Sequence, residues 1–193
     1  MQITGMLWGR KLLDLVEFPH SEVRGPELSV DEIKDMIKRH GMVFIKPLFK
    51  GGVGKKGKAG LMGRVDNITD ALKEKERLYF AEHVDGFSKV KSDGVTYEGA
   101  VPAEYEVYFS ISESTEHRCP IMTVTHHGGV DIEELPEDKI KVVPFDSLTG
   151  LKAYHVSNAL MELGAPPQVI SPLVQNLPKL WDLYNNYGML MLE

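Results

Sequence analysis

A lysine inside an apolar strand, followed at once by a basic glycine-rich loop, constrains this sequence more than any other feature. Residues 42–49, MVFIKPLF, form a β-rich apolar run that Lys46 and Pro47 interrupt. The loop at residues 50–60 then holds five glycines and four lysines. A lysine in such a strand is rarely buried without a partner, so we expect its ammonium to meet either a carboxylate or a bound phosphate.

The loop itself has the composition of an anion-binding segment. Glycines let backbone N–H groups turn toward an anion at little steric cost, and Lys55, Lys56 and Lys58 add positive charge. This charge is local, because the chain as a whole has a formal net charge of −6. The loop is not a P-loop, since Lys58 precedes Ala59 where that motif requires Ser or Thr. Two interpretations remain open here: a phosphate site, or a solvated basic hairpin tip.

Two carboxylates, Glu98 and Glu106, stand eight residues apart on either side of GAVPA, a predicted break between strands. A carboxylate accepts two hydrogen bonds from ribose hydroxyls, and a strand crossover leaves backbone groups for an adenine edge. The alternative is one solvated strand face, because Glu104 and Glu106 alternate with Tyr105 and Val107.

The hydrophobic pattern predicts a mixed α and β protein. A helix is expected at 29–41, from a Ser29 cap to a Gly41 stop. The segment 85–94 is polar and turn-rich, and the three runs after it are expected to form an antiparallel meander. The other expected elements are strands at 42–49, 61–65 and 140–145, helices at 67–83, 153–163 and 171–187, and a short final strand at 189–193.

Composition excludes several classes of function. The negative net charge argues against non-specific binding of nucleic acid or an anionic membrane. We expect no membrane span and no signal peptide. The single Cys119 excludes an internal disulfide framework and a cysteine zinc site; it favours a reducing, cytoplasmic setting and is expected to be a small buried residue. His126 and His127 lack a partner at metal-ligand spacing, so no metal ligand is assigned to them.

Four stretches carry a resemblance to a known family: FIKPLFKGGVGKKGKAGLMG, YEGAVPAEYEVYFSI, THHGGVDIEEL and the terminal MLMLE. Across about residues 43–193 the sequence resembles the ATP-grasp region of the β-type subunit of nucleoside-diphosphate-forming acyl-CoA synthetases. That superfamily includes ATP-citrate lyase, citryl-CoA synthetase and succinyl-CoA synthetase. Pro47, LMGRV and HHGGVD resemble the first two more than the third.

The resemblance implies roles for the lysines of the loop region. Lys46 matches the family's lysine that contacts the nucleotide phosphates. Lys56 and Gly57 match its basic-glycine pair, with Lys55 just before them. The interval from Lys46 to Lys56 is two residues longer than the family pattern, which leaves the register of the loop open.

The resemblance also implies a nucleoside site and a catalytic carboxylate. Glu98 and Val101 match residues at the adenine hinge, and Glu106 matches the ribose-binding carboxylate. Glu193 resembles a glutamate near the phosphorylated histidine of the partner subunit. The Asn and Asp that hold Mg²⁺ in the family are expected after Glu193, so we expect a truncated chain that makes no thioester alone.

The implied fold is α+β of ATP-grasp type, with two α+β subdomains and a nucleotide cleft between them, truncated at the C-terminus. Residues 1–19 and 99–193 are expected to form the larger subdomain, incomplete at its C-terminal end. Residues 20–98 form the small lid subdomain with the phosphate loop.

The implied reaction is ATP- and Mg²⁺-dependent formation of an acyl-CoA from a carboxylic acid. It passes through a phosphohistidine on a partner α-type subunit or domain, and it uses CoA and citrate or succinate. The intact enzyme is expected to be a hetero- or homo-oligomer. The alternatives are a succinyl-CoA synthetase β fragment, another ATP-grasp ligase that joins a carboxylate to an amine, and a non-catalytic ATP-grasp module.

Overall fold

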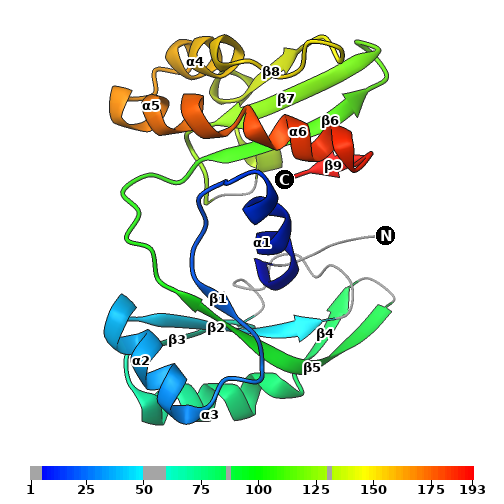
Figure 1. The fold of residues 1–193 in the computed structure, drawn as a ribbon. Coiled ribbons are helices and arrows are strands. Elements are labelled where there is room, and N and C mark those ends of the chain that lie inside the picture. Colours follow the sequence, from blue (N-terminus) through cyan, green and yellow to red (C-terminus); the bar gives the residue numbers. More distant parts are fainter. Residues whose placement is uncertain (1–5, 50–59, 86–87, 130–131) are drawn as a thin grey trace. The chain divides into compact units, whose positions relative to one another are not determined.

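The computed structural model describes residues 6–49, 60–85, 88–129 and 132–193. The chain divides into two compact units (Figure 1). The first unit comprises the residues up to Leu12 together with His20–Pro102, and the second comprises Leu13–Pro19 and Ala103–Glu193. Each unit combines a β-sheet with helices, so the predicted mixed α and β class is confirmed. The subdomain boundaries expected after residues 19 and 98 stay predictions.

The first unit is an antiparallel sheet with two helices on one face (Figure 1). The strand order is β1-β5-β2-β3, and β4 pairs with β5. Its core joins buried residues of β2, β5, α2 and α3. After α1 (Met6–Leu15), the elements are β1 (Val23–Arg24), α2 (Val30–His40), β2 (Val43–Phe49), β3 (Gly63–Val65), α3 (Ile68–Tyr79), β4 (Glu82–Asp85) and β5 (Ser88–Gly99).

Helix α2 has the ends that its sequence predicts. The Ser29 hydroxyl accepts a hydrogen bond from the Glu32 backbone N–H, and the Glu32 carboxylate accepts one from the Ser29 N–H at 2.9 Å, which completes a capping box. Gly41 ends the helix with a left-handed φ of 70°, which glycine adopts without steric cost. Ile33, Met36 and Ile37 are the buried face.

The predicted polar turn at 85–94 is wrong. From Ser88 onward this segment is the first half of β5, a strand of 12 residues whose start pairs with β4. Exposed Lys89 and Lys91 alternate with half-buried Val90 and buried Ser92, whose hydroxyl donates to the Gly94 carbonyl at 2.6 Å. The segment forms a strand because it pairs with the preceding strand β4 and, at Ser92, with Phe49 of β2.

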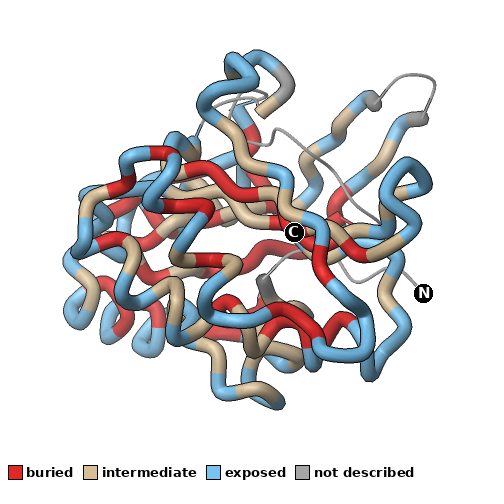
Figure 2. Tube along the Cα trace, turned by 90° about the horizontal axis from the view of Figure 1, so that it is seen from above, coloured by how far each residue is buried: buried red, intermediate tan, exposed pale blue. Residues whose placement is uncertain are grey.

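The second unit has a four-stranded antiparallel sheet with order β8-β7-β6-β9. Buried residues of its strands and of helices α4 to α6 share one core, and the red segments of Figure 2 trace buried residues along the chain. The elements are β6 (Tyr108–Ser114), β7 (Cys119–Thr125), 3-10 turns at Ile132–Glu134 and Glu137–Lys139, β8 (Lys141–Pro144), α4 (Ala153–Glu162), α5 (Pro167–Asn176), α6 (Lys179–Asn186) and β9 (Met191–Leu192).

Three further expectations need correction. The predicted meander is wrong, because β5 belongs to the first sheet while β6 and β7 belong to the second. Residues 100–107 between them lie outside helix and strand. The helix predicted at 171–187 is two helices, since Pro178 has no N–H to continue the helical ladder. Cys119 is half-buried rather than buried.

An early segment of the chain belongs to the second unit. Leu13 and Phe18 pack against that unit's hydrophobic core. The Lys179 ammonium at the start of α6 donates to the Glu17 carbonyl at 3.0 Å and to the Asn176 side chain at 3.1 Å. The segment Leu13–Pro19 is therefore held by both apolar and polar contacts.

Candidate functional site

Lys46 on β2 forms an ion pair with Glu98 on β5. The strands pair Lys46 with Thr96 and Phe44 with Glu98, so Lys46 and Glu98 are diagonal neighbours on one face of the sheet. The alternate β2 residues, including buried Val43 and Ile45, face the helices. The Lys46 and Glu98 side chains are 29% and 13% exposed. Of the two partners expected for this lysine, the structure supplies the carboxylate.

The backbone of Glu98 is part of the sheet. Glu98 pairs with Phe44 on one side and with Val23 on the other. Two residues later, the Ala100 N–H still donates to the Met42 carbonyl at 3.0 Å. The first residue beyond this pairing is Val101, whose side chain is 62% exposed. Sheet pairing of the backbone therefore ends at residue 100, and the adenine hinge expected around Glu98 and Val101 stays a prediction.

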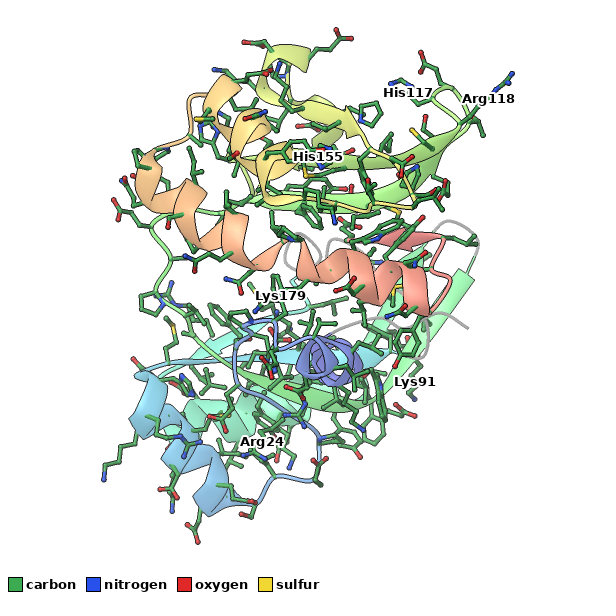
Figure 3. The ribbon with its side chains drawn as sticks, turned by 45° about the horizontal axis from the view of Figure 1, so that its top comes forward. Arg24, Lys91, His117, Arg118, His155 and Lys179 are labelled. Atoms are coloured by element: carbon green, nitrogen blue, oxygen red, sulfur yellow. The ribbon has the colours of Figure 1, made fainter. Side chains whose placement is uncertain are left out.

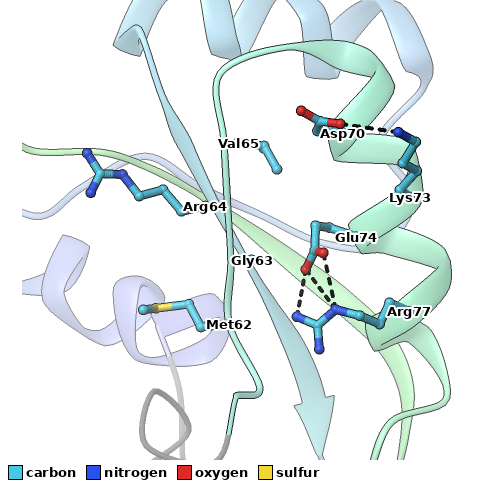
Figure 4. A pocket seen from close by; sticks show the side chains of 8 residues that line it. All are labelled: Met62, Gly63, Arg64, Val65, Asp70, Lys73, Glu74 and Arg77. Carbon is cyan, nitrogen blue, oxygen red and sulfur yellow. Dashed lines mark hydrogen bonds and ion pairs between the residues drawn. The ribbon is translucent and has the colours of Figure 1, made fainter.

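The glycine-rich loop at 50–59, with Lys55, Lys56 and Gly57, lies outside the described residues. Gly60, which follows it, has a left-handed φ of 67°, and its carbonyl accepts a hydrogen bond from Arg77 at 3.0 Å. Arg77 also donates to the Glu74 carboxylate, beside a pocket of ≈ 290 Å³ between β3 and α3 (Figure 4). Three basic and two acidic side chains line this pocket.

Glu106, in the second unit, lies against the turn that carries His127. The Gly128 N–H donates to the Glu106 carbonyl at 2.8 Å. A Cβ on Gly128 would approach the Glu106 carbonyl carbon to 2.7 Å, and one on Gly129 would collide with the Glu106 carboxylate. The paired glycines therefore allow a close approach that a side chain would prevent. Glu106 itself is exposed.

The rings of the two adjacent histidines, His126 and His127, are in contact, with centroids 4.1 Å apart and their planes tilted by 37°. Burial lowers the pKa of His126, with smaller contributions from His127 and Lys139. Within the described ranges, no group of three or more His, Cys, Asp or Glu residues is arranged to hold a metal ion. Glu193 is exposed and follows β9, which pairs with β6. The structure places Glu98 beside Lys46, and it places neither of them with Glu193 in one unit.

Sequence reasoning missed a charged cluster around Glu22 in the first unit. The Glu22 carboxylate accepts hydrogen bonds from Arg24 at 3.1 Å, from Arg39 at 2.9 Å and from His40 at 2.9 Å; Figure 3 labels Arg24. Burial would raise the pKa of Glu22, but these hydrogen bonds outweigh burial and lower the pKa to about 2. No sequence spacing signals the cluster, because residues 22 and 39–40 meet only in the folded unit.

These two α+β units, one with a half-buried strand lysine before a glycine-rich loop, define a protein of the ATP-grasp class. The chain belongs to the ATP-grasp domain family, whose model matches residues 15–193. None of the helices in the described ranges combines the length and apolar character needed to cross a membrane.

Curated relatives identify the branch of the family. The β subunit of the ADP-forming succinate–CoA ligase of Desulfatibacillum aliphaticivorans is 29% identical over 175 residues, which are 87% of this chain and 45% of the relative. Its counterpart in Halobacterium salinarum is 31% identical over 136 residues, 67% of this chain and 34% of the relative. The chain thus spans less than half the length of these relatives. The resemblance to the ATP-grasp region of β-type subunits is confirmed.

Solved structures confirm the predicted ATP-grasp fold. ATP citrate lyase from Methanothrix soehngenii, in complex with citrate and coenzyme A, matches 94% of this chain and 41% of that chain, with a TM-score of 0.65 and 20% identity. The dinucleotide-forming acetyl-coenzyme A synthetase 1 of Ca. Korarchaeum cryptofilum matches 94% of this chain and 78% of that one, with a TM-score of 0.63 and 12% identity. At such identities the likeness concerns the fold alone.

Proposed function

We propose that this chain is the nucleotide-binding ATP-grasp part of an acid–CoA ligase of the ATP-citrate lyase or citryl-CoA synthetase type. The observation that carries the proposal is Lys46, a half-buried cation on the sheet face away from the helices, four residues before the glycine-rich loop. Membership of the ATP-grasp domain family and the succinate–CoA ligase relatives support it.

In this proposal, different residues of the chain contact the phosphates, the adenine and the ribose of the nucleotide. Lys46, with Lys55, Lys56 and Gly57 of the loop, binds the phosphates, and its role is electrostatic rather than covalent. Val101 and the backbone after Glu98 meet the adenine, and Glu106 accepts hydrogen bonds from the ribose. Mg²⁺, when bound, neutralises charge on the phosphates.

The complete reaction that we propose needs partners. ATP phosphorylates a histidine of a partner α-type subunit or domain, near Glu193, and ADP leaves. The phosphoryl group passes to a carboxylate of citrate or succinate, and CoA then displaces phosphate to give the thioester. The working enzyme is a hetero- or homo-oligomer in the cytoplasm.

A β-type subunit of a succinate–CoA ligase is the second candidate, because the curated relatives carry that name. A carboxylate–amine ligase and a non-catalytic ATP-grasp module are the remaining alternatives. The organic acid that the enzyme uses distinguishes the citrate-type enzyme from succinate–CoA ligase. A product with a new bond to an amine would identify a carboxylate–amine ligase, and the absence of ATP binding would identify a non-catalytic module.

The test has two stages. Isothermal titration with ATP, ADP and tripolyphosphate, with and without Mg²⁺, is expected to show binding of all three ligands. Incubation of the chain with ATP, Mg²⁺, CoA and either acid is expected to yield no thioester above a no-enzyme control, because the proposed histidine belongs to the partner. Absence of ATP binding would overturn the proposed function, and thioester formed by the chain alone would overturn the need for a partner.

A further inference from the structure

The end of strand β5 is covered by a histidine ring. A Cβ built on Gly99 would lie 2.7 Å from three ring atoms of His40, which is closer than side chains approach in real structures. The imidazole therefore lies directly on the Gly99 backbone, and only glycine leaves room for it. His40 is the last residue of α2, so the contact joins the end of a helix to the end of a strand.

The same histidine is hydrogen-bonded to Glu22, the residue before strand β1. The His40 Nε2 donates to the Glu22 carboxylate at 2.9 Å, and the Glu22 carbonyl accepts a hydrogen bond from the Gly99 N–H at 2.9 Å. Glu22 is thus bonded through its side chain to His40 and through its backbone to Gly99. The His40 and Glu22 side chains are 25% and 23% exposed, so this hydrogen bond is partly shielded from water.

The segment that leaves this contact begins the proposed adenine hinge. Ala100 is held by its N–H to the Met42 carbonyl at 3.0 Å, and Val101 is the first residue past the sheet. The direction in which the backbone leaves Gly99 therefore sets where the Val101 peptide groups lie. The His40 ring packed on Gly99 restricts the direction in which the backbone leaves Gly99 more than the backbone hydrogen bonds would restrict it alone.

We propose that His40 is a positioning residue for the nucleoside part of the bound nucleotide, acting through Gly99 on the backbone of residues 100–102. The inference rests on the proposed function, because it concerns how the hinge is held. The competing explanation is that His40 only stabilises the end of α2. The two explanations differ in which ligands lose affinity when the ring is removed.

The experiment uses the full chain and three variants. His40→Ala removes the ring and the hydrogen bond, whereas His40→Gln keeps a planar amide that donates to Glu22. Arg39→Ala is the matched control, because Arg39 bonds the same carboxylate at 2.9 Å while Gly99 is covered by His40. Affinities for ATP and tripolyphosphate are measured by calorimetry. Thermal unfolding reports on stability, and amide hydrogen exchange is followed at Gly99 and Ala100.

His40→Ala is expected to weaken ATP binding by roughly threefold to tenfold and to leave tripolyphosphate binding unchanged. Exchange at Gly99 and Ala100 should become faster. His40→Gln should recover most of the affinity, and Arg39→Ala should lower thermal stability without changing ATP affinity. Equal losses for both ligands, or unchanged exchange at Gly99 in His40→Ala, would overturn the inference. If the unmodified chain binds no ATP, the proposed function fails instead, and the exchange data still decide whether His40 orders this strand end.

Discussion

Glu98 and Glu106 are separated by eight residues, yet the two units use these carboxylates differently. Glu98 lies on a sheet strand, is 13% exposed and is paired with Lys46. Glu106 lies in a segment without helix or strand, is exposed, and is held through its backbone to Gly128. The charge of Glu98 is therefore balanced within the first unit, whereas the carboxylate of Glu106 faces solvent.

This difference in burial and pairing indicates different roles for the two carboxylates: one positions a neighbouring side chain and the other binds a ligand. A partly buried carboxylate with a cation beside it holds that cation in place, because leaving either charge alone would be costly. An exposed carboxylate beside a glycine turn has oxygens available to hydroxyl donors. We therefore expect Glu98 to act on Lys46, and Glu106 to act on a ligand.

Lys46→Ala should have the largest effect on ligand binding. A charge-assisted contact contributes about 1.5–3 kcal/mol, so ATP and tripolyphosphate affinity should both fall by about tenfold or more. Calorimetric titration measures the change. Lys89→Ala is the control, because Lys89 forms an exposed ion pair with Glu82 at 2.7 Å in the same sheet. Equal affinity in Lys46→Ala and the unmodified chain would remove Lys46 from the phosphate site.

Glu106→Gln tests the ligand side of the comparison. The amide keeps the size of the side chain and removes its charge, so ATP and ADP should bind roughly fivefold more weakly. Tripolyphosphate, which has no ribose, should bind unchanged. The neighbouring Glu104→Gln is the matched control, since both residues are exposed in the same segment. Losses of the same size for all three ligands would contradict a ribose contact.

Glu98→Gln tests whether the ion pair of Glu98 with Lys46 stabilises the first unit. Loss of the pair with half-buried Lys46 should lower the free energy of unfolding by about 1 kcal/mol. Glu106→Gln, at an exposed position, should change it by less than about 0.5 kcal/mol. Urea denaturation of the two variants measures both values. The comparison fails if the two substitutions cost the same stability.

Acid should weaken the two units at different pH values. In the second unit, His155 Nδ1 accepts a hydrogen bond from the Lys152 N–H at 3.0 Å, and burial together with the Lys152 charge lowers the pKa of His155 below 6.5. The neutral His155 ring therefore stabilises the folded unit above pH 6.5, and this contribution is lost as the pH falls below that value. The pKa of Glu22 falls from 4.5 to about 2 in the first unit, so its contribution is lost only between those values.

Amide hydrogen exchange followed from neutral to acid pH resolves the two units separately. His155→Asn should reduce the loss at higher pH in the second unit, where His126 also has a lowered pKa. Glu22→Gln should reduce the loss at lower pH in the first unit. Exchange that accelerates first around α2 and β1 would contradict this order.

Two buried tyrosines should give the smallest effects, with opposite signs. Tyr97 is fully buried in the first unit, burial raises its pKa to about 12, and its hydroxyl has no partner among the described residues. Tyr97→Phe should be neutral or stabilising by up to about 1 kcal/mol, because it removes an unpaired polar group. The Tyr184 hydroxyl donates to the Leu190 carbonyl at 3.4 Å. Tyr184→Phe should therefore lower the free energy of unfolding by about 0.5 kcal/mol. Thermal unfolding of both variants measures the signs.

The elements that the sequence predicts well are those with local determinants. The Ser29 and Glu32 capping box and the Gly41 stop belong to one helix, and Lys46 stands in a strand whose apolar run is visible in the sequence. The strand character of residues 88–94 and the division of β5 and β6 between two sheets were not predicted. Residues 88–91 pair with the preceding strand β4 in a segment whose polar composition hides the strand, and partners distant in sequence decide which sheet β5 and β6 join. The same reason hides His40 and Glu22, 18 residues apart.

The chain passes between the two units three times, at Leu12–Leu13, at Pro19–His20 and at Pro102–Ala103. A single protease cut in the exposed stretch 101–106 would therefore give two fragments that do not correspond to the two units. The N-terminal fragment would carry Leu13 and Phe18, whose side chains complete the core built by the C-terminal fragment. The fragments would remain associated through that shared core, so a cut chain would run as one species under native conditions and as two under denaturing ones.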